Sequence, residues 1–145
     1  MIQIKETRLW LGNASDLRDM AAVLDQGITA IIDLAAEEPV PVVFRALNYC
    51  RFVLSDDGGN DESLVEAAIV CSAALLRTQQ TAICCAAGLS RSAAISAAAL
   101  ALSSGRSLDE ALARIAQYKH LDVNPALWKH IAHVYSRLAP PPTVS

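Results

Sequence analysis

The sequence lacks several signatures that would assign it to common functional classes. It contains neither a G-x-x-x-x-G-K-[ST] nucleotide-binding motif nor the glycine fingerprint of dinucleotide-binding proteins. It also has no uninterrupted apolar run long enough to cross a bilayer, and no apolar segment that follows a basic N-terminal start. We therefore expect a cytoplasmic protein.

Cysteine pairs with metal-ligand spacing are absent as well. The four cysteines are Cys50, Cys71, Cys84 and Cys85, and none of them forms a CxxC pair. Cys50 and Cys71 are interpreted as small buried hydrophobic residues. We expect reduced thiols, no metal and no cofactor.

The chain has no excess of positive charge. Lys and Arg total 12 against 15 Asp and Glu, so the net charge is −3. This balance disfavours partners such as nucleic acid or acidic membrane surfaces. The 145 residues, 53% of them hydrophobic, suit one domain over residues 1–139. We expect a monomer, and a loose Pro-rich tail at residues 140–145.

Short apolar runs alternate with helical patterns along the chain. Strands are predicted at residues 2–4, 9–11, 28–34, 49–54 and 81–84. Helices are predicted from Asn13 or Ser15 to about Gln26, after Asp61, after Arg91, after Ser107 and from Asn124. This alternation predicts an α/β fold with a central, mainly parallel sheet flanked by helices.

The most informative stretch is TAICCAAGLSRS, residues 81–92. A buried strand is predicted to end at Cys85, and a helix to begin at Arg91, with a loop of small residues between them. Backbone N–H groups beside a helix N-terminus form an anion site, and Gly88 supplies the φ freedom of a tight loop. The residues predicted to bind phosphate are Ala86, Ala87, Gly88, Leu89, Ser90 and Arg91.

Three side chains complete this predicted site. The planar guanidinium of Arg91 can bind two phosphate oxygens at once, which Lys cannot do. We expect the same positive field to favour the thiolate of Cys85, the attacking species in covalent phosphoryl transfer. Ser92 can donate a hydrogen bond to the sulfur and help it leave in the second step.

The segment CAAGLSRS, residues 85–92, resembles the C-x5-R-[ST] loop of the cysteine-dependent protein tyrosine phosphatases, and most of all their small dual-specificity members. Residues 8–19, 27–37 and 124–131 resemble other parts of that family. The resemblance implies a protein tyrosine phosphatase-like fold of the dual-specificity type. It also implies hydrolysis of phosphate monoesters, in phosphotyrosine and phosphoserine or phosphothreonine of proteins or in a small metabolite, through a phosphocysteine.

The resemblance further implies an acidic residue on a loop about thirty positions before the nucleophile, where this chain has SDDGGND. Asp56 is the preferred general acid, because it directly follows Leu54-Ser55 at the predicted strand end, and Asp57 is the alternative. Asp61 is interpreted as the N-cap of the next helix.

The chain departs from the family at Cys84, where these phosphatases usually have a histidine that steadies the loop. Cys84 is a poor hydrogen-bond donor in its place. Four hypotheses stay open: a weaker enzyme, a phosphate-binding pseudophosphatase, redox control through capture of an oxidised Cys85, or sulfur or arsenate chemistry at the same loop. The uncharged Ala86, Ala87 and Leu89 disfavour a dedicated inositol-phosphate site.

Overall fold

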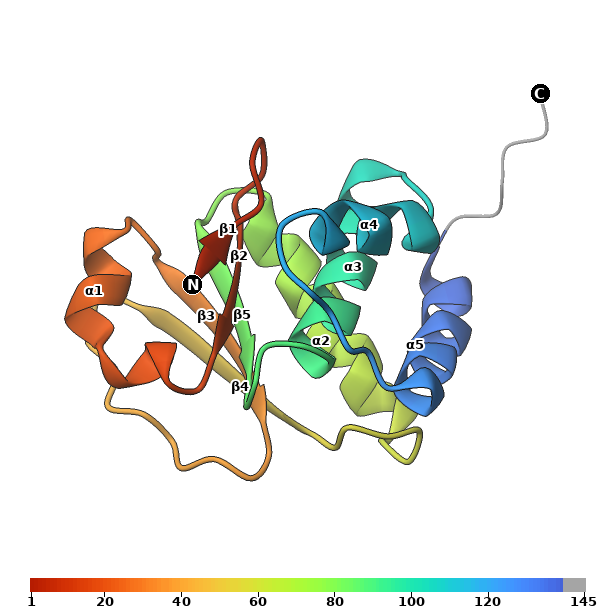
Figure 1. Ribbon diagram of the computed structural model, residues 1–145, viewed down its shortest axis with the longest axis horizontal. Helices are drawn as coiled ribbons and strands as arrows, with labels where there is room; N and C mark the ends of the chain where they lie inside the picture. The colour runs from red at the N-terminus through yellow and green to blue at the C-terminus, as the bar shows by residue number, and fades with distance from the viewer. Residues whose placement is uncertain (140–145) are drawn as a thin grey trace.

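A five-stranded sheet in the order β1-β2-β5-β3-β4 lies at the centre of this computed structural model, which describes residues 1–139 (Figure 1). The strands are β1 Ile2–Gln3, β2 Leu9–Asn13, β3 Ala30–Ala35, β4 Asn48–Leu54 and β5 Thr81–Cys85. Only β1 runs antiparallel to its neighbour. The predicted mainly parallel sheet is therefore confirmed, and the predicted tail at 140–145 lies outside the described residues.

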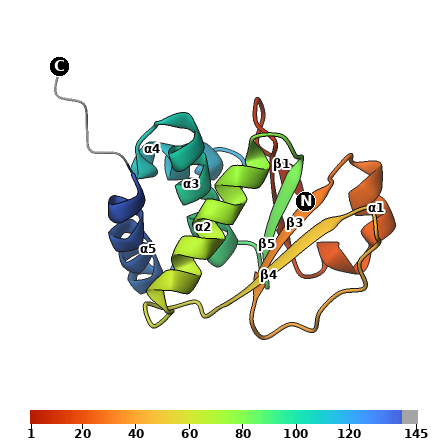
Figure 2. The same cartoon turned by 180° about the vertical axis from the view of Figure 1, so that it is seen from behind.

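The helices cover both faces of the sheet. They are the 3-10 helix η1 Asp16–Arg18, then α1 Met20–Asp25, α2 Glu62–Leu76, α3 Arg91–Ser104, α4 Leu108–Ala116 and α5 Pro125–Leu138. Helices α2 to α5 lie on one side, and η1 with α1 lies on the other (Figures 1 and 2). In the described part of the chain, no helix combines the length and apolarity that a membrane crossing needs.

Strand β5 separates two hydrophobic cores. Its five residues are all buried, and successive side chains of a strand point to opposite faces. Ile83 and Cys85 therefore join the larger core under α2 to α5, whereas Ala82 and Cys84 join the smaller core under η1 and α1. The two adjacent cysteines thus lie in different environments.

The single helix predicted between Asn13 or Ser15 and Gln26 is wrong, because the segment forms two short pieces. The Asp19 carboxylate accepts a hydrogen bond from the Ala22 amide at 3.1 Å, so α1 begins anew after Asp19. Asn13 does accept from the Asp16 amide, at 3.0 Å, but this contact serves only the turn of η1.

Side-chain capping distinguishes α3 from the other α-helices. Asp19, Asp61, Ser107 and Asn124 cap α1, α2, α4 and α5 through their side chains, so the predicted cap at Asp61 is confirmed. Ser90, in the corresponding place before α3, makes no capping hydrogen bond. The first amides of α3 therefore lack the side-chain acceptor that the other helices have.

Candidate active site

The β5–α3 loop, residues 86–90, lies at the carboxyl end of the sheet and is fastened on two sides. The Ala14 amide, just after β2, donates to the Ala86 carbonyl at 3.3 Å. The Asp122 amide, in the segment before α5, donates to the Leu89 carbonyl at 3.1 Å. Both contacts use carbonyl groups of the loop, so the amide groups of the loop take no part in them.

Gly88 occupies a position in this loop that other residues fit poorly. Its φ of +74° lies in the left-handed region. A Cβ built there would come within 2.8 Å of both the Gly12 carbonyl oxygen and Lys119 Nζ. The predicted conformational role of Gly88 is therefore confirmed, and the loop also has a cation, Lys119, that the sequence pattern did not indicate.

Cys85 lies beneath this loop, 2% exposed, with its sulfur between two hydrogen-bonding groups. The Gly88 N–H donates to Cys85 Sγ at 3.2 Å, and Ser92 Oγ lies 3.2 Å from the same sulfur. An N–H group directed at the sulfur stabilises a negative charge there. The structure thus brings together Cys85 and Ser92 as the sequence predicts.

The side chain of Ser90 connects the loop to two other segments instead of capping α3. Its hydroxyl donates to Asp56 Oδ1 at 2.5 Å and accepts from the Asn124 amide at 2.9 Å. The positive end of the 14-residue helix α3 is consequently left open beside Cys85. Unsatisfied amides at such a helix end favour an anion.

Arg91 is the first residue of α3, and its guanidinium is held by one edge. Nη1 donates to Glu37 Oε2 at 2.8 Å and to the Leu54 carbonyl at 2.9 Å, while Nη2 donates to Glu37 Oε1. A guanidinium has five N–H donors, so these bonds leave Nε–H and one Nη2–H without a described partner. Those two donors share the edge that suits two oxygens of a phosphate.

Glu37 was not singled out by the sequence reasoning. It lies two residues after β3, and its hydrogen bond to Arg91 is the largest cause that holds its pKa below 4.5, although partial burial acts in the opposite direction. The same ion pair raises the pKa of Arg91. The sequence signal that could have found Glu37 is its position just after a predicted parallel strand, because residues that follow parallel strands meet at one edge of the sheet.

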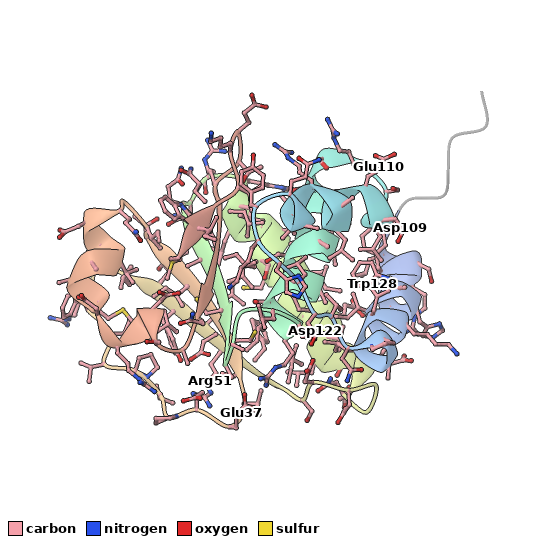
Figure 3. The ribbon with its side chains drawn as sticks, in the orientation of Figure 1. Glu37, Arg51, Asp109, Glu110, Asp122 and Trp128 are labelled. Carbon is pink, nitrogen blue, oxygen red and sulfur yellow. The ribbon has the colours of Figure 1, made fainter. Side chains whose placement is uncertain are left out.

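The loop that carries Glu37, residues 36–47 between β3 and β4, is anchored by Arg51. Arg51 Nη2 donates to the carbonyls of Ala35 and Glu38, both at 2.9 Å. In Figure 3 the labelled Glu37 and Arg51 lie together at the lower edge of the sheet. Arg51 therefore fixes the segment that in turn orients Arg91.

The three aspartates of the β4–α2 loop, residues 55–61, have different surroundings. Asp56 contacts Ser90 of the β5–α3 loop, as described above. Asp57 Oδ1 accepts from the Gly59 amide at 2.8 Å and so stabilises its own turn. Asp61 accepts from the Ser63 amide and hydroxyl, which lower its pKa. Of the three, Asp56 is the one whose described contact reaches the β5–α3 loop.

Cys84 is fully buried on the opposite face of β5 from Cys85. A Cβ at Gly12 would lie 2.9 Å from its sulfur, so glycine permits β2 to pack closely there. Burial is the main cause that raises the Cys84 pKa well above its ordinary value of 9.0, and the nearby carboxylates Asp16 and Asp33 add to it. Cys84 is therefore placed as a packing residue.

The two remaining cysteines contact each other. Cys50 on β4 and Cys71 on α2 have their sulfurs 3.9 Å apart, and burial raises the pKa of Cys71 to about 11. Both are half-buried, in partial agreement with the predicted buried positions. No group of three or more His, Cys, Asp or Glu side chains is arranged for a metal ion within residues 1–139.

Comparison with solved structures identifies the fold. The chain is similar to human DUSP28 with a TM-score of 0.83 and 22% identity, over 95% of this chain and 97% of that one. A mouse putative dual specificity phosphatase complexed with zinc tungstate gives 0.82 and 24%, over 94% and 86%. The human tyrosine phosphatase-like serine/threonine/tyrosine-interacting protein gives 0.79 and 19%, over 93% and 95%.

No protein-family model and no curated protein sequence matches the chain. At these identities the likeness to solved structures concerns the fold. The fold predicted from the loop and its flanking segments is confirmed: it is that of the dual-specificity phosphatases.

Proposed function

Since the chain folds as dual-specificity phosphatases do, we propose that it hydrolyses phosphate monoesters through a phosphocysteine. In the first step Cys85 Sγ attacks phosphorus, the bond to the ester oxygen breaks, and Asp56 gives that oxygen a proton. In the second step Asp56 takes a proton from water, the water oxygen attacks phosphorus, and the P–S bond breaks. Phosphate leaves and the Cys85 thiolate is restored.

The observation that carries this proposal is the convergence of three features on one small volume. Cys85 Sγ accepts from the Gly88 amide, the adjoining N-terminus of α3 is open, and Arg91 has two free N–H donors on one edge. A phosphate dianion satisfies the amides and the guanidinium together. The sulfur is then adjacent to the phosphorus that it attacks.

Charge stabilisation in the proposed transition state comes from preorganised groups. Amides of the β5–α3 loop and Arg91 meet the three equatorial oxygens, where negative charge is spread. Glu37 and the Leu54 carbonyl hold Arg91 in place before substrate arrives. Ser92, 3.2 Å from the sulfur, stabilises the thiolate as it departs in the second step.

The assignment of the acid is supported by contacts on the β4–α2 loop. Asp56 reaches the β5–α3 loop through Ser90, whereas the carboxylate of Asp57 is engaged with the Gly59 amide. An acid that lies against the phosphate-binding loop is within reach of the leaving oxygen. Asp57 therefore stays the weaker alternative.

The proposed substrates are phosphotyrosine and phosphoserine or phosphothreonine in proteins, or a small phosphomonoester. The proposed steps use protein side chains and water, without a metal or cofactor. We further propose that the protein acts as a cytoplasmic monomer, and that neither nucleic acid nor membrane is its partner. Its negative net charge supports this last statement.

The nucleophile is tested with p-nitrophenyl phosphate and a Cys85→Ser variant. The wild-type protein should release p-nitrophenol, and rapid acid quench followed by mass spectrometry should find phosphate on the peptide that contains Cys85. The variant should do neither. Activity that survives Cys85→Ser would contradict the mechanism.

The acid is tested with a matched pair, Asp56→Asn and Asp57→Asn. Loss of a general acid typically costs about 10²- to 10⁴-fold in rate, so Asp56→Asn should lower kcat by that order. The loss should be larger for phenyl phosphate than for p-nitrophenyl phosphate, because the poorer leaving group depends more on a proton. An equal or larger loss in Asp57→Asn would move the acid to Asp57.

The surroundings of Cys84 favour a second candidate function, a phosphate-binding pseudophosphatase. Cys84 stands where the resembling enzymes have histidine, and it is buried in the smaller core with a raised pKa. It is thus a poor hydrogen-bond donor to the loop. This candidate predicts tungstate binding by calorimetry with no hydrolysis of p-nitrophenyl phosphate, which separates it from the enzyme.

A further inference from the structure

A cavity of about 410 Å³ lies beside the proposed catalytic site, on the face of the sheet that carries η1 and α1. One wall is the β3–β4 loop, and the other is formed by the segment after β2 together with η1 and the start of α1. The lining includes Ala14, Arg18, Asp33 and Glu38, together with prolines and apolar side chains from residues 39–44. Its size falls within the range of ligand pockets, about 300 to 1,000 Å³.

This cavity shares structural walls with the catalytic loop. Ala14 lines it, and the Ala14 amide bonds the Ala86 carbonyl of the β5–α3 loop. Glu38 also lines it, directly after Glu37, which holds Arg91. Each wall of the cavity is therefore one hydrogen bond or one residue away from a group of the proposed catalytic site.

The cavity collects most of the exposed apolar side chains of the described protein. Within residues 1–139, five large hydrophobic residues are exposed, and Val40, Val42 and Phe44 of this wall are three of them. Val42 is 83% exposed and Phe44 44%. Apolar surface gathered at one concave place indicates a partner that covers it.

The wall that carries these residues is held in shape without a ligand. Pro39 and Pro41 fix two backbone φ angles, which lowers the freedom of the loop. Arg51 bonds the Glu38 carbonyl, and the Tyr49 hydroxyl donates to Asp33 Oδ2 at 2.5 Å beneath the cavity. The cavity is thus preformed, which reduces the ordering cost of binding.

The charges at the cavity decide between two kinds of occupant. Asp33 lies 3.7 Å from Arg51 in an ion pair, and Glu37 is paired with Arg91. The lining then offers one carboxylate, Glu38, and one cation, Arg18, so it has no cationic excess that would attract the anionic surface of a phospholipid membrane. The burial of an uncharged apolar side chain of a peptide needs no such attraction.

We propose that this cavity is a specificity subsite, which receives a large apolar side chain located within three residues of the phosphorylated residue in a protein substrate. Each residue of an extended segment advances about 3.3 Å, so such a side chain lies close to the bound phosphate. The proposal rests on the proposed function in one respect, the binding of the phosphorylated residue at Cys85.

The test uses phosphotyrosine peptides of one glycine- and serine-rich sequence. A single Leu is moved through positions −3 to +3, with an all-Gly/Ser peptide as reference. Burial of a Leu side chain should raise kcat/KM about tenfold at one or two of these positions. The same ranking should hold for binding to the Cys85→Ser variant, measured by fluorescence anisotropy.

The variant for this test is Val42→Ser combined with Phe44→Ser, both exposed and outside the catalytic site. It should keep the wild-type rate on p-nitrophenyl phosphate and lose the preference for Leu. Val70→Ser serves as the matched control, because Val70 is 44% exposed on α2, away from the cavity lining. The control should keep both the rate and the preference.

Three outcomes would overturn the subsite. The first is a wild-type protein with no Leu preference in either turnover or binding. The second is a double variant that keeps the preference. The third is a short-chain phosphatidic acid in micelles that is preferred over every peptide. The last result would assign an acyl chain to the cavity. Absence of p-nitrophenyl phosphate hydrolysis would instead contradict the proposed function, and the anisotropy measurement would then still decide the subsite.

Discussion

Cys84 and Cys85 are neighbours in sequence, yet the two sides of β5 give them different properties. Cys85 faces the larger core and the β5–α3 loop, where an amide and a hydroxyl contact its sulfur. Cys84 faces the smaller core, where burial raises its pKa. Both residues are cysteines, so the residue type does not distinguish the proposed nucleophile from the packing residue. The face of β5 to which each side chain points does.

The largest expected effect comes from Cys85→Ala. Removal of a nucleophile eliminates the covalent route, so kcat should fall by at least about a thousandfold. Steady-state hydrolysis of p-nitrophenyl phosphate measures this loss, and thermal unfolding should show a folded variant. A fall of less than tenfold would show that the different surroundings of Cys84 and Cys85 do not give them different roles in catalysis.

The next effect concerns Arg91, the proposed phosphate ligand on the Cys85 side of the comparison. Arg91→Lys keeps the charge but loses the planar edge and the contacts to Glu37 and Leu54. We expect kcat/KM to fall about 10²- to 10³-fold, the usual cost of losing a transition-state donor. Tungstate affinity, measured by calorimetry, should weaken in parallel. A Lys variant with near-wild-type kcat/KM would show that the fork geometry is not used.

Glu37→Gln should have a smaller effect on turnover, about tenfold, because the neutral amide still accepts a hydrogen bond but orients Arg91 less firmly. The variant should also change the acid limb of the stability profile. Glu37 has a folded-state pKa below 4.5, so its stabilising contribution is present above pH 4.5 and is lost as the pH falls through that lower value.

Unfolding midpoints measured across that acid range check the second part of the prediction. The wild-type midpoint should fall more steeply than the variant midpoint as the pH drops below 4.5. Identical slopes would indicate that Arg91 is held mainly by the Leu54 carbonyl and not by Glu37.

The smallest effect on activity is expected at Cys84. Cys84→Ala removes one buried sulfur from the smaller core, which should cost about 1 kcal/mol of unfolding free energy and change kcat less than about threefold. Cys84→Ser should destabilise more, since its hydroxyl is buried in an apolar setting. A large loss of activity in a stable Cys84→Ala protein would show that both faces of β5 serve catalysis.

Much of the fold was predictable because its signals are local. Alternating apolar runs, Gly27 after α1, and the caps Asp61, Ser107 and Asn124 lie within a few residues of the elements they define. The Asp19 cap was missed, because it breaks a helical pattern that otherwise continues through η1 and α1.

The site was predictable where its members follow one another in the chain. Cys85, Gly88, Arg91 and Ser92 occur in one strand–loop–helix segment, so their spacing already indicates an anion site beside a thiol. The choice between Asp56 and Asp57 could not be made from adjacent positions. It depends on Ser90, 34 residues away, which contacts Asp56 alone of the two.

By itself, the sequence determined the parallel α/β architecture and the loop from Cys85 to Ser92, because periodicity and local backbone requirements leave marks on neighbouring residues. Only the tertiary structure decided that Glu37 binds Arg91 across 54 residues, that the β3–β4 loop forms one wall of a cavity, and that Cys84 packs in the smaller core with η1 and α1. The physical reason is the sheet: its parallel strands end at one edge and bring together loops that no sequence spacing connects.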